Sequence, residues 1–194
     1  MRPALFAVLL LPTAAVAGEL DLDLGLQATT TGWPDDHGGG AALDLGYWFR
    51  PWLGASFIGK EQYATVDDRF MSYFSVNAAV RHPVGPLRLA GTLGIVHQHE
   101  EPRAAVDEMP VESLFGVGDG IRHRMAGRAG ISLALPLRTH DHGDYYVALD
   151  LDGTKFLDTD KGPSWMTSIG LSVGFTYDFA RTSLAKPEPK ASER

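Results

Sequence analysis

The chain contains 194 residues, carries a formal net charge of −7 at pH 7 and has no cysteine. The lack of cysteine excludes a disulfide framework, and the acidic balance argues against nucleic acid as a partner. The length suits one domain, and no apolar run is long enough for a membrane-spanning helix.

The first 17 residues have the layout of a secretory signal peptide. A short charged start, Met1-Arg2-Pro3, is followed by an apolar run over residues 4–11 and by the small-residue sequence Ala15-Val16-Ala17. The apolar run is too short to span a membrane as a helix. We therefore expect residues 1–17 to direct export and to be cleaved after Ala17. No cysteine follows this site, which excludes a lipid-anchored lipoprotein.

From residue 18 onward, apolar and polar residues alternate in eight segments. In the first segment, leucines at every second position alternate with Asp21, Asp23, Gly25 and Gln27. Successive side chains of a strand point to opposite faces, so each segment presents one apolar and one polar face. The segments cover residues 20–27, 43–50, 53–62, 70–81, 87–95, 124–135, 145–154 and 165–179. The pattern predicts an all-β fold, an eight-stranded antiparallel up-and-down β-barrel over residues 18–180.

The connections between these segments differ in length and composition. An even number of strands places both chain ends on one side of a membrane, which after export is the periplasmic side. The connections that start near residues 32, 66, 98 and 158 then face outward, and those near residues 50, 82 and 137 face the periplasm. By composition we expect loops at Gly32–Gly40 and Arg138–Asp144, and the longest external loop at residues 98–121.

The polar face of the segments distinguishes a transmembrane barrel from a soluble one. A soluble barrel would show long polar residues there, whereas this face consists mostly of Gly, Ala, Ser and Thr with scattered charges. Small residues fit the crowded lumen of an eight-stranded transmembrane barrel. Six acidic residues balance six basic ones, which favours a paired and closed lumen over a pore. These residues are Asp21, Asp23, Asp44, Asp150, Asp152, Asp178, Arg50, Lys60, Arg81, Arg88, Arg124 and Arg128.

The last segment resembles the C-terminal sorting signal of bacterial outer-membrane barrels, with Ser172, Gly174, Tyr177 and Phe179 at the signal positions. With the signal peptide and eight strands, the chain resembles the OmpA/OmpX-type barrels of the Gram-negative cell envelope. This resemblance implies an outer-membrane location, contact with lipid and lipopolysaccharide, and recognition by the barrel-assembly machinery through these four residues. It also implies a non-porin with a structural or surface-interaction role through its extracellular loops.

The chain departs from the family pattern after Phe179, because the signal usually ends the chain and here residues 181–194 follow as a polar tail. We expect this tail to be periplasmic. It is too short for the peptidoglycan-binding domain of OmpA-like proteins, so that activity is not carried over.

Some eight-stranded outer-membrane barrels modify lipid A, as PagL-type deacylases and PagP-type acyltransferases do. A nucleophilic hydroxyl in such an enzyme needs a base within hydrogen-bond reach. Ser113 and His123 share the long loop, and Ser164 lies in another external loop, but no recognisable motif joins them. A lipid A-modifying hydrolase or acyltransferase is therefore the alternative function.

Three histidines near the long loop are candidate metal ligands. His97 and His99 have the same parity in one segment, and His123 begins the neighbouring antiparallel segment at a similar height. Imidazole suits zinc, copper or nickel. Ordinary solvated loop histidines are the alternative interpretation. The glycine-rich sequence Gly116–Gly120 lacks the Lys and Ser/Thr of a phosphate loop, and we expect no cofactor.

Overall fold

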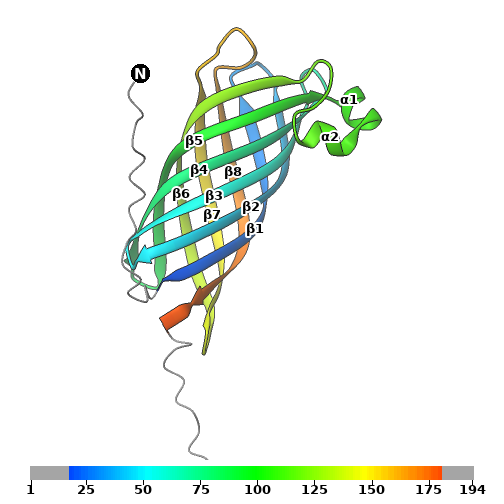
Figure 1. The fold of residues 1–194 in the computed structure, drawn as a ribbon. Coiled ribbons are helices and arrows are strands. Elements are labelled where there is room, and N and C mark those ends of the chain that lie inside the picture. The colour runs from blue at the N-terminus through cyan, green and yellow to red at the C-terminus, as the bar shows by residue number, and fades with distance from the viewer. Residues whose placement is uncertain (1–17, 181–194) are drawn as a thin grey trace, which may run out of the picture.

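The computed structural model describes residues 18–180, which form a closed barrel of eight antiparallel strands (Figure 1). Each strand pairs with the next along the chain, and the last pairs with the first. The predicted fold class is confirmed. The strands are β1 (Glu19–Thr31), β2 (His37–Arg50), β3 (Leu53–Ala64), β4 (Arg69–Val84), β5 (Leu87–Pro102), β6 (Arg122–His140), β7 (Gly143–Phe156) and β8 (Trp165–Asp178). The expected signal peptide, residues 1–17, and the tail, residues 181–194, lie outside the described residues.

Two short helices, α1 (Arg103–Glu108) and α2 (Pro110–Leu114), lie between β5 and β6 on the outer side of the barrel (Figure 1). Proline occupies the first position of α2, where its missing N–H costs nothing. Among residues 18–180, no helix has the length and apolar character needed to cross a membrane.

The alternation in the sequence places apolar side chains outside the barrel and polar ones inside. Leu26, Leu93 and Leu171 are 74%, 69% and 68% exposed on the outer face. In the lumen, the side chains of Lys60 and Arg124 are only 2% and 0% exposed. This distribution is the reverse of that in a soluble protein, in which large apolar patches are rarely left uncovered. It is what a barrel surrounded by lipid requires.

The two ends of the barrel differ in their connections, as the sequence predicted. At the turn end, two-residue turns at 51–52, 85–86 and 141–142 join the strands. The two ends of the described chain meet there, and the Phe179 amide donates to the Gly18 carbonyl at 3.1 Å, a normal backbone hydrogen bond. At the loop end lie the longer connections, residues 32–36, 65–68, 103–121 and 157–164.

Three of the predicted loops have wrong boundaries. β5 continues to Pro102, so the long loop starts at residue 103 and not at 98. β6 and β7 meet at a two-residue turn in place of the expected loop Arg138–Asp144, and β2 begins at His37 within the expected loop Gly32–Gly40. In each case the strand extends past its apolar band. Backbone pairing requires only a neighbouring strand, whereas alternation ends where both faces become polar.

Replacing Leu171 by Arg should lower the free energy of folding into lipid vesicles by about 2–4 kcal/mol, because Leu171 lies on the outer face at the middle of β8. The same change at Val84, beside the turn at 85–86, should cost only about 0–1 kcal/mol because that position is near the interface. Urea titration of the refolded barrel measures both values. Equal costs at the two positions would contradict a lipid-facing band.

Candidate functional site

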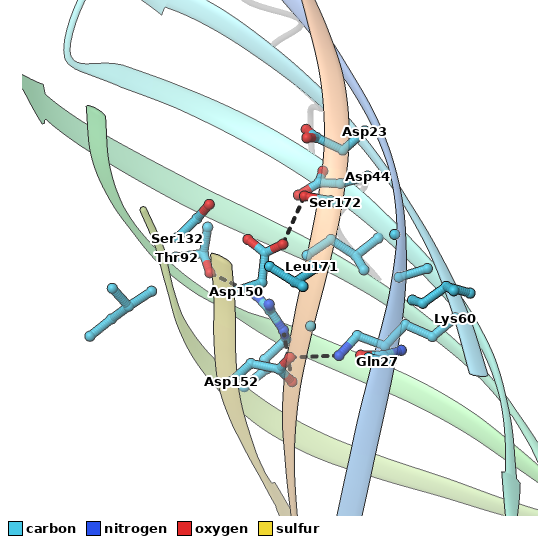
Figure 2. Close-up of a pocket in the computed structure, with 17 residues that line it drawn as sticks. Asp23, Gln27, Asp44, Lys60, Thr92, Ser132, Asp150, Asp152, Leu171 and Ser172 are labelled. Carbon is cyan, nitrogen blue, oxygen red and sulfur yellow. Dashed lines mark hydrogen bonds and ion pairs between the residues drawn. The ribbon is translucent and has the colours of Figure 1, made fainter. Parts of the chain in front are cut away.

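The middle of the lumen is crossed by an ion-pair network that joins strands on different sides of the barrel. The ammonium group of Lys60, from β3, lies 2.7 Å from a carboxylate oxygen of Asp152, from β7 (Figure 2). Arg128, from β6, places Nε 3.6 Å from the other Asp152 oxygen. It also donates to the Thr92 hydroxyl at 2.7 Å. One buried carboxylate therefore contacts two buried cations in the middle of the lumen.

The part of the lumen nearest the turn end is filled by aromatic side chains that form hydrogen bonds. Trp48 donates to Asp21 and Tyr146 donates to Asp23, each at 2.6 Å. The guanidinium of Arg81 lies 4.2 Å from the Trp48 ring centroid. Arginine over an aromatic face adds a favourable cation–π interaction. Bulky side chains thus occupy the lumen toward the turn end.

Two small cavities remain between these layers, with volumes of about 90 and 80 Å³. Asp23 and Asp44 line both of them, and Asp150 faces the first, where it accepts a hydrogen bond from Ser172 at 2.9 Å (Figure 2). Ligand pockets usually measure roughly 300–1,000 Å³, so these cavities suit water rather than a solute.

The predicted pairing of six acidic with six basic lumen residues is confirmed only in part. Lys60, Arg81 and Arg128 pair with predicted acids. Arg50 is exposed at the turn end and donates to the Phe49 carbonyl, and Asp178 accepts from the Ala180 amide. These two lie at strand ends, where side chains can reach water and need no buried partner. Other partners of the arginines come from outside the predicted set.

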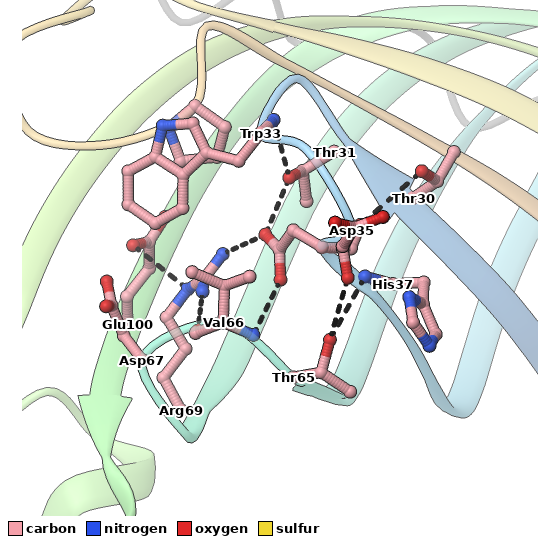
Figure 3. A network of polar contacts seen from close by, with 12 residues as sticks. Thr30, Thr31, Trp33, Asp35, His37, Thr65, Val66, Asp67, Arg69 and Glu100 are labelled. Atoms are coloured by element: carbon pink, nitrogen blue, oxygen red, sulfur yellow. Dashed lines mark hydrogen bonds and ion pairs between the residues drawn. The ribbon is translucent and has the colours of Figure 1, made fainter.

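The loop end of the lumen is closed by a second network, which we call the mouth network and which contains Asp36, Arg69, Glu100, Arg122, Arg124 and Asp158. Figure 3 shows Arg69 and Glu100 with the neighbouring loop residues Trp33 and Val66. Arg69 lies 2.7 Å from Asp36, and its guanidinium also donates to the Val66 carbonyl. The connection at residues 32–36 is thereby tied to β4.

Glu100 is the centre of the mouth network. One of its oxygens lies 2.9 Å from Arg124, and the other lies 2.9 Å from Arg122 and 3.6 Å from Arg69. Three cations from two strands therefore share one fully buried carboxylate. Such a carboxylate requires cationic or hydrogen-bonded partners, because burial removes its hydration.

Arg124 extends the mouth network to the connection between β7 and β8. Its guanidinium lies 3.2 Å from the Asp158 carboxylate and donates to the carbonyls of Asp158 and Pro163, both at 2.8 Å. Trp33 packs beneath Arg69, with the guanidinium carbon 5.1 Å from the ring centroid. Side chains from two loops and three strands thus close the mouth.

Asp36 is held as an anion in this network. Burial raises the pKa of its carboxyl group, but hydrogen bonds outweigh burial, so the pKa lies below its usual range. The donors are the Arg69 guanidinium at 2.7 Å, the Thr31 hydroxyl at 2.6 Å and the Val66 amide at 3.1 Å. Hydrogen bonds to the charged form favour ionisation. The negative charge that balances Arg69 therefore persists through the neutral pH range.

Sequence reasoning missed most of the mouth network. Arg69 and Glu100 have lumen parity, but they lie past the apolar bands that marked the predicted strands. Extending the parity along β4 and β5 could have found them. No pattern could have found Asp36, because its position depends on how the connection at residues 32–36 folds back over the mouth.

The helical segment, residues 103–120, lies against the outside of the barrel at the loop end. The Arg103 amide donates to the Asp68 carbonyl at 3.0 Å, which ties the segment to the connection between β3 and β4. A cavity of about 220 Å³ lies between the segment and the strands, with Ser72, Glu101 and Val106 in its lining. Three apolar side chains of the segment remain 59–68% exposed, namely Val111, Phe115 and Val117.

The candidate nucleophiles have structural roles in the described chain. Ser113 is buried, and its hydroxyl donates to the Ala105 carbonyl at 3.1 Å, which joins α2 to α1. The hydroxyl proton is therefore directed to a carbonyl and not to the His123 imidazole. The Ser164 carbonyl accepts from the Phe156 amide at 3.1 Å, which orders the connection between β7 and β8.

The three candidate metal ligands come together on the outer face of β5 and β6. The Nε2 atoms of His97 and His99 are 2.8 Å apart. His99 and His123 face each other in the strand register, with ring centroids 4.7 Å apart. One nitrogen from each ring lies within 4.8 Å of the others. The predicted grouping of these side chains is confirmed, while metal binding stays a prediction.

Three residues of the predicted sorting signal lie in β8, with Ser172 and Gly174 on its lumen face and Tyr177 on its outer face, and Phe179 follows directly after the strand. Ser172 points into the lumen toward Asp150, and a Cβ on Gly174 would collide with the Tyr146 ring there. Tyr177 and Phe179 pack edge to face, with ring centroids 4.9 Å apart. Phe179 is 44% exposed, so the pair presents aromatic surface at the turn end.

Replacing Arg69 by Met should lower the free energy of unfolding by about 3–5 kcal/mol, because Asp36 and Glu100 would lose a buried cation. Arg103 is the matched control. It pairs with Asp68 and Asp107 on the surface, where its side chain is 59% exposed, so Arg103→Met should change stability by less than about 1 kcal/mol. Urea unfolding of the refolded proteins gives both values. A loss for Arg69→Met no larger than for the control would contradict the role assigned to the mouth network.

Comparison with solved structures agrees with this architecture. The chain superposes on Neisserial surface protein A (NspA) with a TM-score of 0.57 and 10% sequence identity, covering 84% of this chain and 97% of that one. It superposes on Ail, the attachment invasion locus protein of Yersinia pestis, in complex with the heparin analogue sucrose octasulfate. The TM-score is 0.52 and the identity 19%, over 83% of this chain and 99% of that one. No protein-family model and no curated protein sequence matches the chain. The fold is that of the eight-stranded outer-membrane β-barrels.

Proposed function

We propose that this protein is a bacterial outer-membrane barrel that forms no pore and acts at the cell surface through its loop end. The observation that carries the proposal is the closed lumen inside an apolar exterior. The mouth network and the Lys60–Asp152 pair block the lumen at two levels, and the remaining cavities measure about 90 and 80 Å³. A barrel built in this way offers no path for solutes, so its interactions take place at its outer surface.

Aromatic residues at both ends of the outer face support placement in a membrane. At the turn end, the Tyr145 and Phe175 rings lie 4.8 Å apart, beside Tyr177 and Phe179. At the loop end, Trp165 is 42% exposed. Such residues anchor outer-membrane barrels at the two interfaces. The turn end then faces the periplasm and the loop end faces outward.

The partners that we propose follow from this orientation. Lipid surrounds the apolar band, and lipopolysaccharide surrounds the loop end, where Lys155 is exposed and pairs in register with Trp165. A lysine at this height suits an anionic headgroup. The barrel-assembly machinery would recognise the end of β8 through Ser172, Gly174, Tyr177 and Phe179. Of these, Tyr177 and Phe179 supply the accessible aromatic contact.

The helical segment is the surface that we propose for interaction at the loop end. It lies outside the barrel and exposes Val111, Phe115 and Val117, although solvent-exposed loops are usually polar. A cluster of exposed apolar side chains is typical of a surface that binds another protein or a membrane. Modification of lipid A remains the alternative function, but the Ser113 hydroxyl bonds to a carbonyl, so no observation favours that chemistry.

The refolded protein should show no stable porin-like conductance in planar bilayers, because ion-paired side chains fill the lumen. The double substitution Asp36→Ser with Arg69→Ser removes one pair of the mouth network without changing the net charge. It should still show no stable steps, because the Lys60–Asp152 pair continues to block the lumen at the second level. Arg103→Ser with Asp107→Ser removes an exposed pair and should likewise leave the conductance unchanged. Large, stable steps from the unmodified protein would contradict a closed barrel.

The orientation can be tested with single cysteines, because the chain has none of its own. In intact cells, Val111→Cys in α2 should react with a membrane-impermeant maleimide, whereas Asp141→Cys in a turn at the opposite end should not. Permeabilised cells should label at both positions, which shows that both variants fold and that both thiols are accessible. Labelling of Asp141→Cys alone in intact cells would contradict this orientation and would show that the turn end faces outward.

A further inference from the structure

We propose that the outer face of β5 and β6 at the loop end holds a copper ion, bound by His97, His99, His123 and the thioether of Met125. The site lies outside the closed lumen and is independent of the proposed surface interaction. It consists of two directly facing cross-strand pairs, His97 with Met125 and His99 with His123. Side chains at alternate positions of one strand share a face, so all four project to the same side of the sheet.

The contacts between these side chains show that the histidine nitrogens converge and that the Met125 sulfur lies beside them. His97 directs Nε2 toward the His99 Nε2 at 2.8 Å, while its other ring nitrogen, Nδ1, lies 3.3 Å from the Met125 sulfur. The sulfur therefore reaches an ion held between the histidines by rotation of the flexible methionine side chain. The ring centroids of His97 and His123 lie 5.7 Å apart. Imidazole nitrogens that share a tetrahedral metal at about 2.0–2.1 Å lie about 3.3 Å from one another. Nitrogens within 4.8 Å of one another differ from that spacing by at most about 1.5 Å, which lies within the reach of side-chain rotation.

The surroundings of His99 are those of an oriented ligand. Its side chain is 8% exposed, and its Nδ1 lies 4.0 Å from a carboxylate oxygen of Glu101. With Nε2 facing the other donors, Nδ1 faces this carboxylate. Metal-bound histidines usually direct their second nitrogen to such a group, which orients the ring and makes it a stronger ligand. Phe74 also packs edge-on against the His99 ring, with centroids 5.9 Å apart.

The connection from α2 to β6 covers the rings of His99 and His123 on the side that faces away from the barrel. A Cβ on Gly116 would lie 2.6 Å from the His99 ring and 2.8 Å from the His123 ring, and the φ of Gly116 is +73°. Only glycine fits this backbone conformation at this distance without strain. His97 and His123 are exposed, so an ion can still enter from the side.

The donor set favours copper over other metals. Three imidazoles suit zinc, copper and nickel, but a thioether is a soft ligand that favours Cu(I). No carboxylate oxygen belongs to the converging group within residues 18–180, so a site for calcium or magnesium is not formed here. Met125 is 45% exposed on the outer face and opposes His97, which places its sulfur at the edge of the histidine group.

Titration of the refolded barrel with Cu(I), without oxygen and in competition with a chromogenic chelator, tests the proposal. We expect one ion per chain. Met125→Leu, which keeps the side-chain volume, should weaken Cu(I) binding by about tenfold, equal to about 1.4 kcal/mol, while Zn²⁺ binding changes little. His99→Gln should weaken binding of both ions, and Glu101→Gln should weaken it by about 10–100-fold through orientation of His99.

The control is His82→Gln, at an exposed histidine near the turn end of β4, which should bind copper like the unmodified protein. Heat-modified mobility on gels shows that each variant has folded. X-ray absorption of the unmodified copper complex gives a second measurement, in which we expect nitrogen and sulfur neighbours. Equal Cu(I) affinity in His99→Gln, or a copper spectrum without sulfur, would overturn the proposal. So would zinc binding with no effect of Met125→Leu on Cu(I).

Discussion

The structure depends on the pairing of charges inside a barrel that is too narrow to hydrate them. An eight-stranded barrel is filled by its own side chains, so the fully buried guanidinium of Arg124 has no access to bulk water. Glu100, Asp158 and two carbonyls replace that water. Pairs such as Lys60–Asp152 also join strands that are not neighbours in the sheet. The same contacts that satisfy the charges therefore brace the barrel and close its lumen.

A closed lumen leaves the outside of the barrel to interact with other molecules. The apolar band is suited to lipid, and above it, at the loop end, the outer face changes character. Polar side chains such as His97 and Glu101 occupy outward positions there, and the helical segment lies against Glu101. The polar side chains of the outer face are thus concentrated in one region, between the apolar band and the outer loops.

The eight strands could be predicted because lipid outside and a packed lumen inside impose strict alternation. One apolar residue, Ile58, occupies a position of the polar face in the third segment, residues 53–62. It is 5% exposed and points into the lumen, so this interruption of the alternation reflects packing and not a strand end. Parity brought His97 and His99 together, and antiparallel pairing added His123. The mouth network could not be predicted, because Asp36 meets Arg69 only after a loop folds back. The place of Met125 beside His97 becomes visible only from the strand register.

The pairing of β1 with β8 has a consequence for assembly. It joins residues near the start of the described chain to residues near its end, Glu19 with Asp178 and Thr31 with Met166. Contacts between residues so distant in sequence form slowly. Until β8 arrives, β1 exposes an unpaired edge that can add a strand from another chain. Newly made copies must therefore be kept apart from one another until the last strand has been delivered, and the rate of this closure limits how quickly the protein can be produced without aggregation.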